Sequence, residues 1–256
     1  MPKYATVAID SVGELARLYF SKDMGKSGKD TEKIRQMNNY PGSTERMNML
    51  VRSIKQKRDA GCEIVFTAHE DIEKVYAKGG GMASPGQPAP EPIAVKGWPD
   101  IPGRRAPDEF CRACDNVIRV RRWNQGGKLV PCWVTNREGI GAGAEYWEVK
   151  DRFNGPGVGS GLFNASYSDL KAAVIKTNPE WWQAPYIWML YGPFGIGKTR
   201  SLLTFPKPIL VFDLDLGTKS LTATEIKTAE MTIIKDINVE DSSHYSNFIG
   251  KLEAAF

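Results

Sequence analysis

The most constraining feature of this sequence is a glycine-rich motif late in the chain, residues 192–199, which fits the pattern G-x-x-x-x-G-K-T. The apolar residues 186–191 before it predict a buried strand, and Ser201-Leu-Leu after it can form the first turns of a helix. Glycines let the backbone wrap closely around phosphates and direct its N–H groups toward them. The sequence therefore predicts a strand, a phosphate-binding loop and a helix, rather than a chance turn that contains Lys-Thr.

The residues expected to contact a bound nucleotide run from the first glycine of the motif to the residue after its threonine. They are Gly192, Pro193, Phe194, Gly195, Ile196, Gly197, Lys198, Thr199 and Arg200. Lys198 is expected to reach the β- and γ-phosphates, and the Thr199 hydroxyl is expected to hold Mg²⁺. ATP and Mg²⁺ are thus the predicted cofactors.

The size and composition suit one soluble α/β domain, because 41% hydrophobic and 25% charged residues are ordinary for a globular chain of 256 residues. No apolar run approaches the length of a membrane span, and the start of the chain does not resemble a signal peptide. We therefore expect a cytoplasmic protein without a membrane partner. The net charge of +4 permits nucleic acid as a partner without requiring it.

Four cysteines do not make a disulfide framework in such a chain. The pair Cys111-x-x-Cys114 lacks two further ligands at a similar spacing, which a zinc site needs. Buried apolar cysteines on a short helix, predicted at residues 108–115, explain the pair better.

Three further β-rich runs end in polar side chains. Residues 4–9 end in Asp10-Ser11, residues 62–68 end in His69-Glu70, and residues 209–212 lead into Asp213 and Asp215. Polar residues at the carboxyl ends of parallel strands face the ligand crevice of α/β proteins. We therefore expect Asp10 to contribute to Mg²⁺ binding, and Asp213 or Asp215 to orient the attacking water. An ordinary polar strand end is the alternative for Asp10 and for His69.

Other elements follow from hydrophobic spacing and turn signals. Residues 43–61 predict a helix, since Met47, Leu50, Val51 and Ile54 recur at i, i+3, i+4 and i+7 and form a packed face. Residues 116–123 and 128–135 predict a hairpin around Asn124-Gln-Gly-Gly127. Residues 245–256 predict an amphipathic helix, and residues 157–182 have the character of a connector with a short helical pattern.

Two basic segments are predicted to be loops. The first contains Lys22, Lys26, Lys29 and Lys33. The second, residues 78–107, is too rich in glycine and proline for regular structure, and with its flank it contains Lys74, Lys78, Lys96, Arg104 and Arg105. Together with Tyr76 and Trp98 these cations suit contact with a phosphate backbone and stacking on bases, although a plain flexible insertion is an equally good explanation.

A further basic pair, Lys150 and Arg152, lies on a segment that is predicted to be extended. Residues two apart on such a segment project from the same face, which suits contact with one anionic target. A solvated charge pair is the alternative.

In their joint order these motifs resemble the RecA-like ATPase core, provided that residues 185–256 are read before residues 1–156. Residues 192–199 are then similar to the Walker A loop, and Asp10-Ser11 resembles the Walker B acid. Asp215 stands where the family keeps its water-activating acid, often Glu, and His69 stands where recombinases have a polar residue that senses the γ-phosphate. Lys150-Asp-Arg152 looks like the K-x-R element that such subunits insert into a neighbour's ATP site.

This resemblance implies a circularly permuted RecA-like ATPase, closest to phage-encoded nucleotide-binding proteins that include single-strand-annealing ATPases. The implied fold is α/β, with a mainly parallel sheet flanked by helices and a β-hairpin, in one domain over residues 1–256. Residues 1–156 are its Walker B half, residues 157–184 a connector and residues 185–256 its Walker A half. Met1 and Phe256 are expected to be neighbours in space.

The resemblance also implies a mechanism and partners. Lys198, Asp215 and His69 would be catalytic within one subunit, and Lys150 and Arg152 would act on the ATP site of a neighbour in a ring or filament. Single-stranded DNA is the implied partner, in phage recombination, annealing or replication in the host cytoplasm, and a single-strand-binding protein is a further candidate. A nucleotide-dependent regulatory module with little hydrolysis remains an alternative. A permuted GTPase is disfavoured because the sequence has no N-K-x-D segment.

Overall fold

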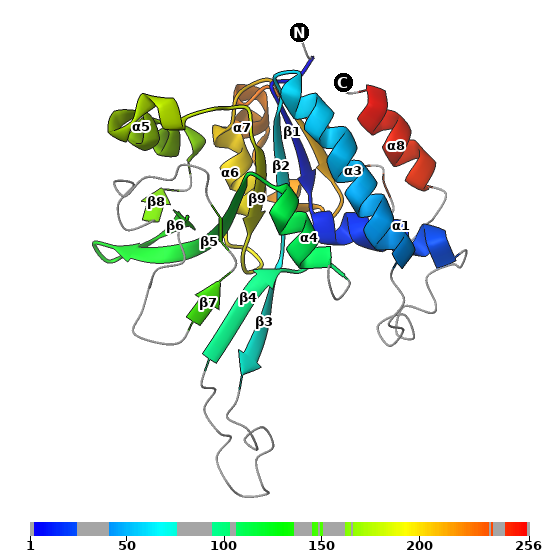
Figure 1. The fold of residues 1–256 in the computed structure, drawn as a ribbon. Coiled ribbons are helices and arrows are strands. Elements are labelled where there is room, and N and C mark those ends of the chain that lie inside the picture. Colours follow the sequence, from blue (N-terminus) through cyan, green and yellow to red (C-terminus); the bar gives the residue numbers. More distant parts are fainter. Residues whose placement is uncertain are drawn as a thin grey trace, which may run out of the picture.

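The computed structural model describes residues 3–24, 41–75, 94–102, 106–135, 145–147, 149–150, 162–164, 166–235, 237 and 244–254. In these residues a twisted eight-stranded sheet forms the centre of the molecule, with the strand order β11-β10-β1-β2-β9-β5-β6-β8 (Figure 1). Its strands are β1 (Thr6–Asp10), β2 (Glu63–Ala68), β5 (Asn116–Gln125), β6 (Lys128–Val134), β8 (Leu162–Asn164), β9 (Ile187–Tyr191), β10 (Ile209–Asp213) and β11 (Met231–Ile234).

Neighbouring strands are parallel from β11 through β5, and the predicted hairpin adds antiparallel β6, to which β8 is antiparallel as well. Strands β1, β9 and β10 are buried at every position, as expected for apolar runs covered on both faces. The prediction of an α/β fold with a mainly parallel sheet is therefore confirmed.

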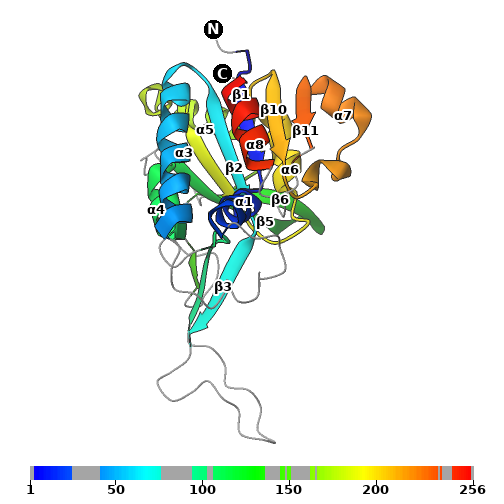
Figure 2. The ribbon, with the colours of Figure 1, turned by 90° about the vertical axis from the view of Figure 1, so that its right-hand side faces the viewer.

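Helices cover both faces of this sheet. Figure 2 looks onto the face covered by α1 (Val12–Met24), α3 (Pro41–Asp59), α4 (Ala106–Ala113) and α8 (His244–Ala254). The opposite face packs against α5 (Tyr167–Thr177), α6 (Lys198–Ser201) and α7 (Ala223–Thr228), with the short 3₁₀ turns η2 (Pro179–Trp181), η3 (Leu202–Thr204) and η4 (Gly217–Ser220) beside them. Parallel strands buried by helices on both sides place their ligand site at the carboxyl edge of the sheet.

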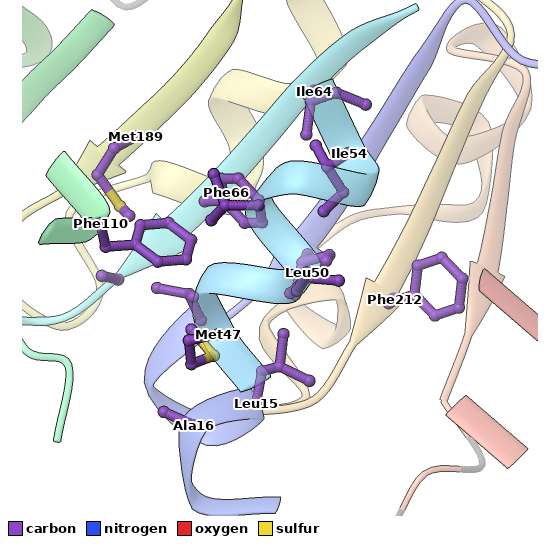
Figure 3. Packing of buried hydrophobic residues seen from close by; sticks show 14 of the residues in the cluster. Leu15, Ala16, Met47, Leu50, Ile54, Ile64, Phe66, Phe110, Met189 and Phe212 are labelled. Carbon is purple, nitrogen blue, oxygen red and sulfur yellow. The ribbon is translucent and has the colours of Figure 1, made fainter. Parts of the chain in front are cut away.

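The core of the first face confirms the predicted helix at residues 43–61. Ile54 of α3 lies beside Ile64 of β2, and Met47 lies toward Leu15 and Ala16 of α1 (Figure 3). Phe110 of α4 packs edge-on against Phe66, with ring centroids 4.7 Å apart. The spacing of apolar residues along α3 thus identified the buried face correctly.

The core of the second face contains a buried carboxylate, Glu63, at the start of β2. It accepts hydrogen bonds from Tyr167 Oη at 2.6 Å, from the Tyr186 N–H at 2.8 Å and from Trp188 Nε1 at 2.7 Å. Burial raises the pKa of Glu63, and these three hydrogen bonds oppose the rise. This network joins β2, β9 and α5 beneath the site without taking part in it.

A second, three-stranded sheet projects from the carboxyl edge of the main sheet. It consists of β3 (Glu70–Val75), β4 (Ala94–Pro99) and β7 (Glu145–Trp147), in the order β3-β4-β7 (Figure 1). We call it the β3–β4–β7 arm. Its base is fixed by a buried ion pair between Arg119 Nε and Glu70 Oε1 at 2.6 Å, and by the Asp100 N–H, which donates to the His69 carbonyl at 2.8 Å.

Three expectations are corrected by these elements. The prediction of a structureless segment at residues 78–107 is wrong for β4, which pairs with β3. Lys22 lies on α1, which runs to Met24, and not in a loop. The predicted connector at residues 157–182 also contributes β8 to the main sheet, whereas its predicted short helical pattern is confirmed as α5. In each case a partner that is distant in sequence supplies the pairing or burial, so local composition gives little indication of it.

Both described ends of the chain lie at the same end of the molecule. The start of β1 and the end of α8 are close together in two perpendicular views (Figures 1 and 2). Met1 and Phe256 themselves lie outside the described residues.

Candidate nucleotide-binding site

The phosphate-binding motif forms a loop between β9 and α6, as the sequence predicts. Gly195 and Gly197 adopt φ values of +68° and +105°, a region that residues with a Cβ rarely occupy. At Gly192 a Cβ would lie 2.3 Å from the carbonyl oxygen of Val120, so the loop begins in close contact with β5. These three positions therefore need glycine for local reasons.

The Lys198 side chain is held inside the curve of the loop. Its Nζ donates to the carbonyl oxygens of Gly192 and Pro193, at 2.9 Å each. Burial lowers the pKa of Lys198, whereas the nearby carboxylates of Asp10 and Asp215 act in the opposite direction. The ammonium group is therefore positioned where phosphates would replace the two carbonyl contacts.

Asp10, at the end of β1, is linked to the loop helix. Its Oδ2 accepts a hydrogen bond from Thr199 Oγ1 at 2.7 Å, and its Oδ1 accepts one from Thr67 Oγ1. Burial, reinforced by Asp215, raises the pKa of Asp10 to about 6, although both hydroxyl hydrogen bonds act to lower it. The structure thus brings together Thr199 and Asp10, the two residues predicted to hold Mg²⁺.

Asp215 and His69 meet at the same edge of the sheet. His69 follows β2, and its Nε2 lies 3.4 Å from Asp215 Oδ2. Burial alone would raise the pKa of Asp215, but the hydrogen bonds from His69 and from the Gly217 N–H outweigh it and lower the pKa. Asp215 is therefore ionised and oriented, which suits a group that positions a water molecule.

Asp213 belongs to the same cluster, although the sequence suggested it only as an alternative to Asp215 for water orientation. One oxygen each of Asp10, Asp213 and Asp215 lies within 4.8 Å of the other two. The Asp213 Oδ2 atom accepts hydrogen bonds from the N–H and hydroxyl groups of Thr218. Its Oδ1 atom is buried and has no hydrogen-bond partner among the described residues.

Gly217 is a site residue that sequence reasoning missed. A Cβ there would lie 2.6 Å from Thr199 Oγ1, 2.8 Å from Asp10 Oδ2 and 3.0 Å from Asp215 Oδ1. The glycine thus leaves a small space that is bounded by three oxygen atoms. Mg²⁺ prefers such hard oxygen ligands, so Thr199, Asp10 and Asp215 fit it. A bound Mg²⁺ would neutralise negative charge on phosphate oxygens.

The remaining predicted loop residues differ in their surroundings. Phe194 is 88% exposed at the tip of the loop, and its ring centroid lies 5.8 Å from that of His69. Ile196 packs into the second core. The guanidinium of Arg200 faces away from the loop curve, because it contacts Glu225 Oε1 at 2.8 Å and the Ser220 carbonyl at 3.3 Å.

Lys150 is engaged within its own subunit. It forms a backbone bridge with Val117, and its Nζ donates to the carbonyl oxygens of Arg112 at 3.0 Å and Cys114 at 2.5 Å, at the end of α4. Its predicted partner Arg152 lies outside the described residues. Cys111 and Cys114 are both buried, as predicted for apolar cysteines.

Of the predicted DNA-binding residues, Lys96 is exposed on β4, in the β3–β4–β7 arm. Lys22 lies on α1 and Lys74 on β3. The others lie outside the described residues: Lys26, Lys29, Lys33, Lys78, Arg104 and Arg105.

Comparison with known proteins agrees with this site. Residues 184–254 match the protein-family description "AAA domain", a range that contains the loop, Asp213 and Asp215. No curated protein and no solved structure matches the chain. Among the described helices, none has the length and apolar character that crossing a bilayer requires. Residues 184–254 are thus similar to an AAA-type P-loop domain.

Proposed function

We propose that this protein is a circularly permuted RecA-like ATPase that acts on single-stranded DNA in phage recombination, annealing or replication. The observation that carries the proposal is the convergence of residues from four strands at one edge of the sheet. Asp10 is the last residue of β1, His69 follows β2, the phosphate-binding loop follows β9, and Asp215 follows β10.

The strand order supports the permutation. Read from the loop strand, the chain passes through β9, β10, β11 and α8, and would then continue through β1, β2 and β5, all in parallel register. The start of β1 lies close to the end of α8, so a short connection could join them (Figure 2). The displaced ends of such an original chain would be bridged by the connector at residues 157–182.

In the proposed mechanism each residue has a positional role. Lys198 and the loop N–H groups bind the β- and γ-phosphates, and Thr199 and Asp10 hold Mg²⁺. Asp215 accepts a hydrogen bond from the attacking water, and His69 fixes the orientation of Asp215 and senses the γ-phosphate. Phosphoryl transfer needs mainly such positioning and charge stabilisation.

We assign Lys150 and Arg152 to the ATP site of a neighbouring subunit, which makes an oligomer necessary for turnover. In this role Lys150 Nζ exchanges its contacts with the Arg112 and Cys114 carbonyl oxygens for contacts with the neighbour's nucleotide. Mixing two inactive variants tests this. The Lys198→Ala variant lacks the phosphate-binding lysine of its loop but keeps Lys150 and Arg152. The Arg152→Ala variant keeps an intact loop but lacks the arginine that the neighbouring site needs. Activity that reappears on mixing supports a shared site. Arg152→Ala with wild-type turnover would refute it, and Lys128→Ala, an exposed hairpin lysine, is the matched control.

The β3–β4–β7 arm is the proposed contact for single-stranded DNA, because it begins directly after His69 and exposes Lys96. Binding through phosphates should depend strongly on salt and little on sequence. The test measures ATP turnover with and without single-stranded DNA at low salt. We expect stimulation, and we expect Lys96→Ala to reduce the salt slope of binding by about 1 unit relative to the exposed control Lys227→Ala. Turnover indifferent to DNA would contradict the DNA role.

A regulatory module with little hydrolysis is the second candidate, favoured by the short Asp215 side chain that His69 holds. In that case ATP binds without appreciable phosphate release. Asp215→Glu, which extends the carboxylate toward the nucleotide, would then raise turnover, whereas an efficient ATPase would lose activity.

A further inference from the structure

The carboxylate cluster contains more negative charge than the P-loop motif requires. Asp10 and Asp213 are register partners on adjacent parallel strands, and both side chains are almost completely buried. Asp215 follows two residues later, and its carboxylate lies within 4.8 Å of the other two. Three carboxylates are thus gathered at one buried point where two strands end.

The Asp213 carboxylate is only partly satisfied by the protein. Thr218 occupies its Oδ2, but its buried Oδ1 has no hydrogen-bond partner among the described residues. A buried carboxylate oxygen without a partner is costly, because it has lost its contacts with water. This atom therefore indicates a ligand that is supplied from outside the chain.

Protein groups offer limited positive charge to the cluster. His69 contacts Asp215 on one side. Lys198 directs its Nζ at two loop carbonyls, and the hydroxyls of Thr67 and Thr199 donate to Asp10. Within the described part of the chain, none of these hydrogen bonds or ion pairs involves Asp213.

We propose that Asp10, Asp213 and Asp215 bind a hard divalent cation, of the Mg²⁺ and Mn²⁺ class, in the nucleotide-free protein. Asp213 is the added ligand, which the glycine-rich motif does not indicate. The role of this cation in ATP hydrolysis rests on the proposed function. The binding of the cation itself requires neither ATP nor hydrolysis.

The oxygen spacing suits one cation. Two oxygen ligands on opposite sides of a cation are separated by twice the metal–oxygen distance, which is about 4.2 Å for Mg²⁺ and about 4.8 Å for Ca²⁺. The three carboxylate oxygens already lie within 4.8 Å of one another, so small side-chain movements are enough to bring them around an ion. An all-oxygen ligand set favours Mg²⁺, Mn²⁺ or Ca²⁺ over softer metals.

Binding before ATP has a thermodynamic consequence. A ligand that binds only the folded protein raises its stability in proportion to the logarithm of ligand concentration above the Kd. Mg²⁺ alone should therefore raise the melting temperature of the nucleotide-free protein. A P-loop that receives its cation only with the nucleotide would show no such shift.

The experiment titrates the full-length, nucleotide-free protein with Mn²⁺ and counts free Mn²⁺ by electron paramagnetic resonance. We expect saturable binding that Mg²⁺ displaces, and a loss of affinity of roughly tenfold or more in Asp213→Asn. Asp169→Asn, an exposed aspartate at the start of α5, should bind Mn²⁺ as the wild type does. Absence of saturable binding, or an unchanged affinity in Asp213→Asn, would overturn the inference.

Two further measurements keep the test independent of folding and of ATP hydrolysis. If Asp213→Asn does not fold, Asp215→Asn, whose side chain is 17% exposed, must weaken Mn²⁺ binding, and unchanged affinity there overturns the inference. ATP turnover is assayed separately. Turnover without nucleotide-free Mn²⁺ binding refutes this inference alone, whereas Mn²⁺ binding without turnover supports it and refutes ATP hydrolysis.

Discussion

Thr199 Oγ1 donates a hydrogen bond to Asp10 Oδ2 over 2.7 Å, although 189 positions separate the two residues in the chain. The contact joins the first turn of α6 to the end of β1, and therefore joins the late phosphate-binding loop to the first strand. Both oxygens are ligands that Mg²⁺ accepts. The two side chains proposed to hold Mg²⁺ are thus in direct contact across the sheet edge.

Replacing Lys198 by alanine should abolish turnover while the fold is retained. Among the described residues, the Lys198 Nζ donates its hydrogen bonds to two loop carbonyls, so its removal takes charge from the phosphate position without opening a core. We expect a fall in ATP turnover of roughly 10²-fold or more. Phosphate release measures this, and Lys227→Ala on α7 should retain wild-type activity. Comparable activity in both variants would exclude Lys198 from the site.

Gly217→Ala should prevent cation binding without unfolding the protein. The added methyl group would lie within 2.6 to 3.0 Å of Thr199 Oγ1, Asp10 Oδ2 and Asp215 Oδ1. We expect loss of Mg²⁺-dependent turnover, together with an intact circular dichroism spectrum. Gly250→Ala on α8, where a Cβ meets no atom within 4 Å, is the matched control and should remain active. Normal turnover in Gly217→Ala would show that the space beside Gly217 is not used.

Asp10→Asn should stabilise the cation-free protein and inactivate it. In the fold, burial and then Asp215 raise the pKa of Asp10 from 3.8 to about 6. The folded state therefore holds a proton on Asp10 more tightly than the unfolded state does. As the pH rises from 3.8 to about 6, the Asp10 carboxylate progressively lowers the free energy of unfolding, and above about pH 6 the whole loss is present. The asparagine amide has no charge to bury and so avoids this loss. It can keep both hydrogen bonds, because a threonine hydroxyl can accept a hydrogen bond as well as donate one.

Urea unfolding in EDTA at about pH 5 and about pH 7.5 checks this prediction. The variant should be more stable than the wild type by up to about 3 kcal/mol at the higher pH, with a smaller difference at the lower pH. A difference that stays constant between the two pH values, or that favours the wild type, would contradict the proposed linkage.

Glu63→Ala should destabilise the fold more than Glu63→Gln does. Alanine leaves three donors without their acceptor, namely Tyr167 Oη, the Tyr186 N–H and Trp188 Nε1, at a cost of about 3 kcal/mol or more. Glutamine can still accept from Tyr186 and Trp188 and can donate to the tyrosine oxygen. Urea denaturation compares the two variants, with the exposed Glu253→Ala as control. Equal losses in both Glu63 variants would mean that packing, not hydrogen bonding, is decisive there.

Local pattern predicted the elements whose signals lie within a few residues. The loop at residues 192–199, the packed face of α3 and the hairpin of β5 and β6 all follow from spacing and glycine positions. Strand β4 was missed because a glycine- and proline-rich segment precedes it and its partner β3 lies about twenty residues earlier. The Lys150 contacts were missed as well, because the carbonyl oxygens at the end of α4 leave no mark on the sequence around Lys150.

The sequence by itself determined that a phosphate-binding loop is present and which strands end in acidic or polar residues. Only the tertiary structure decided that Asp10 and Asp213 are register partners, and that Asp215, Thr199 and Gly217 surround the same point. The physical reason is that a buried strand has apolar residues on both faces whichever strands lie beside it, so its sequence does not reveal its neighbours. The order of strands in the sheet depends on the crossover connections and on the packing of helices against it, and that order brings the three carboxylates together.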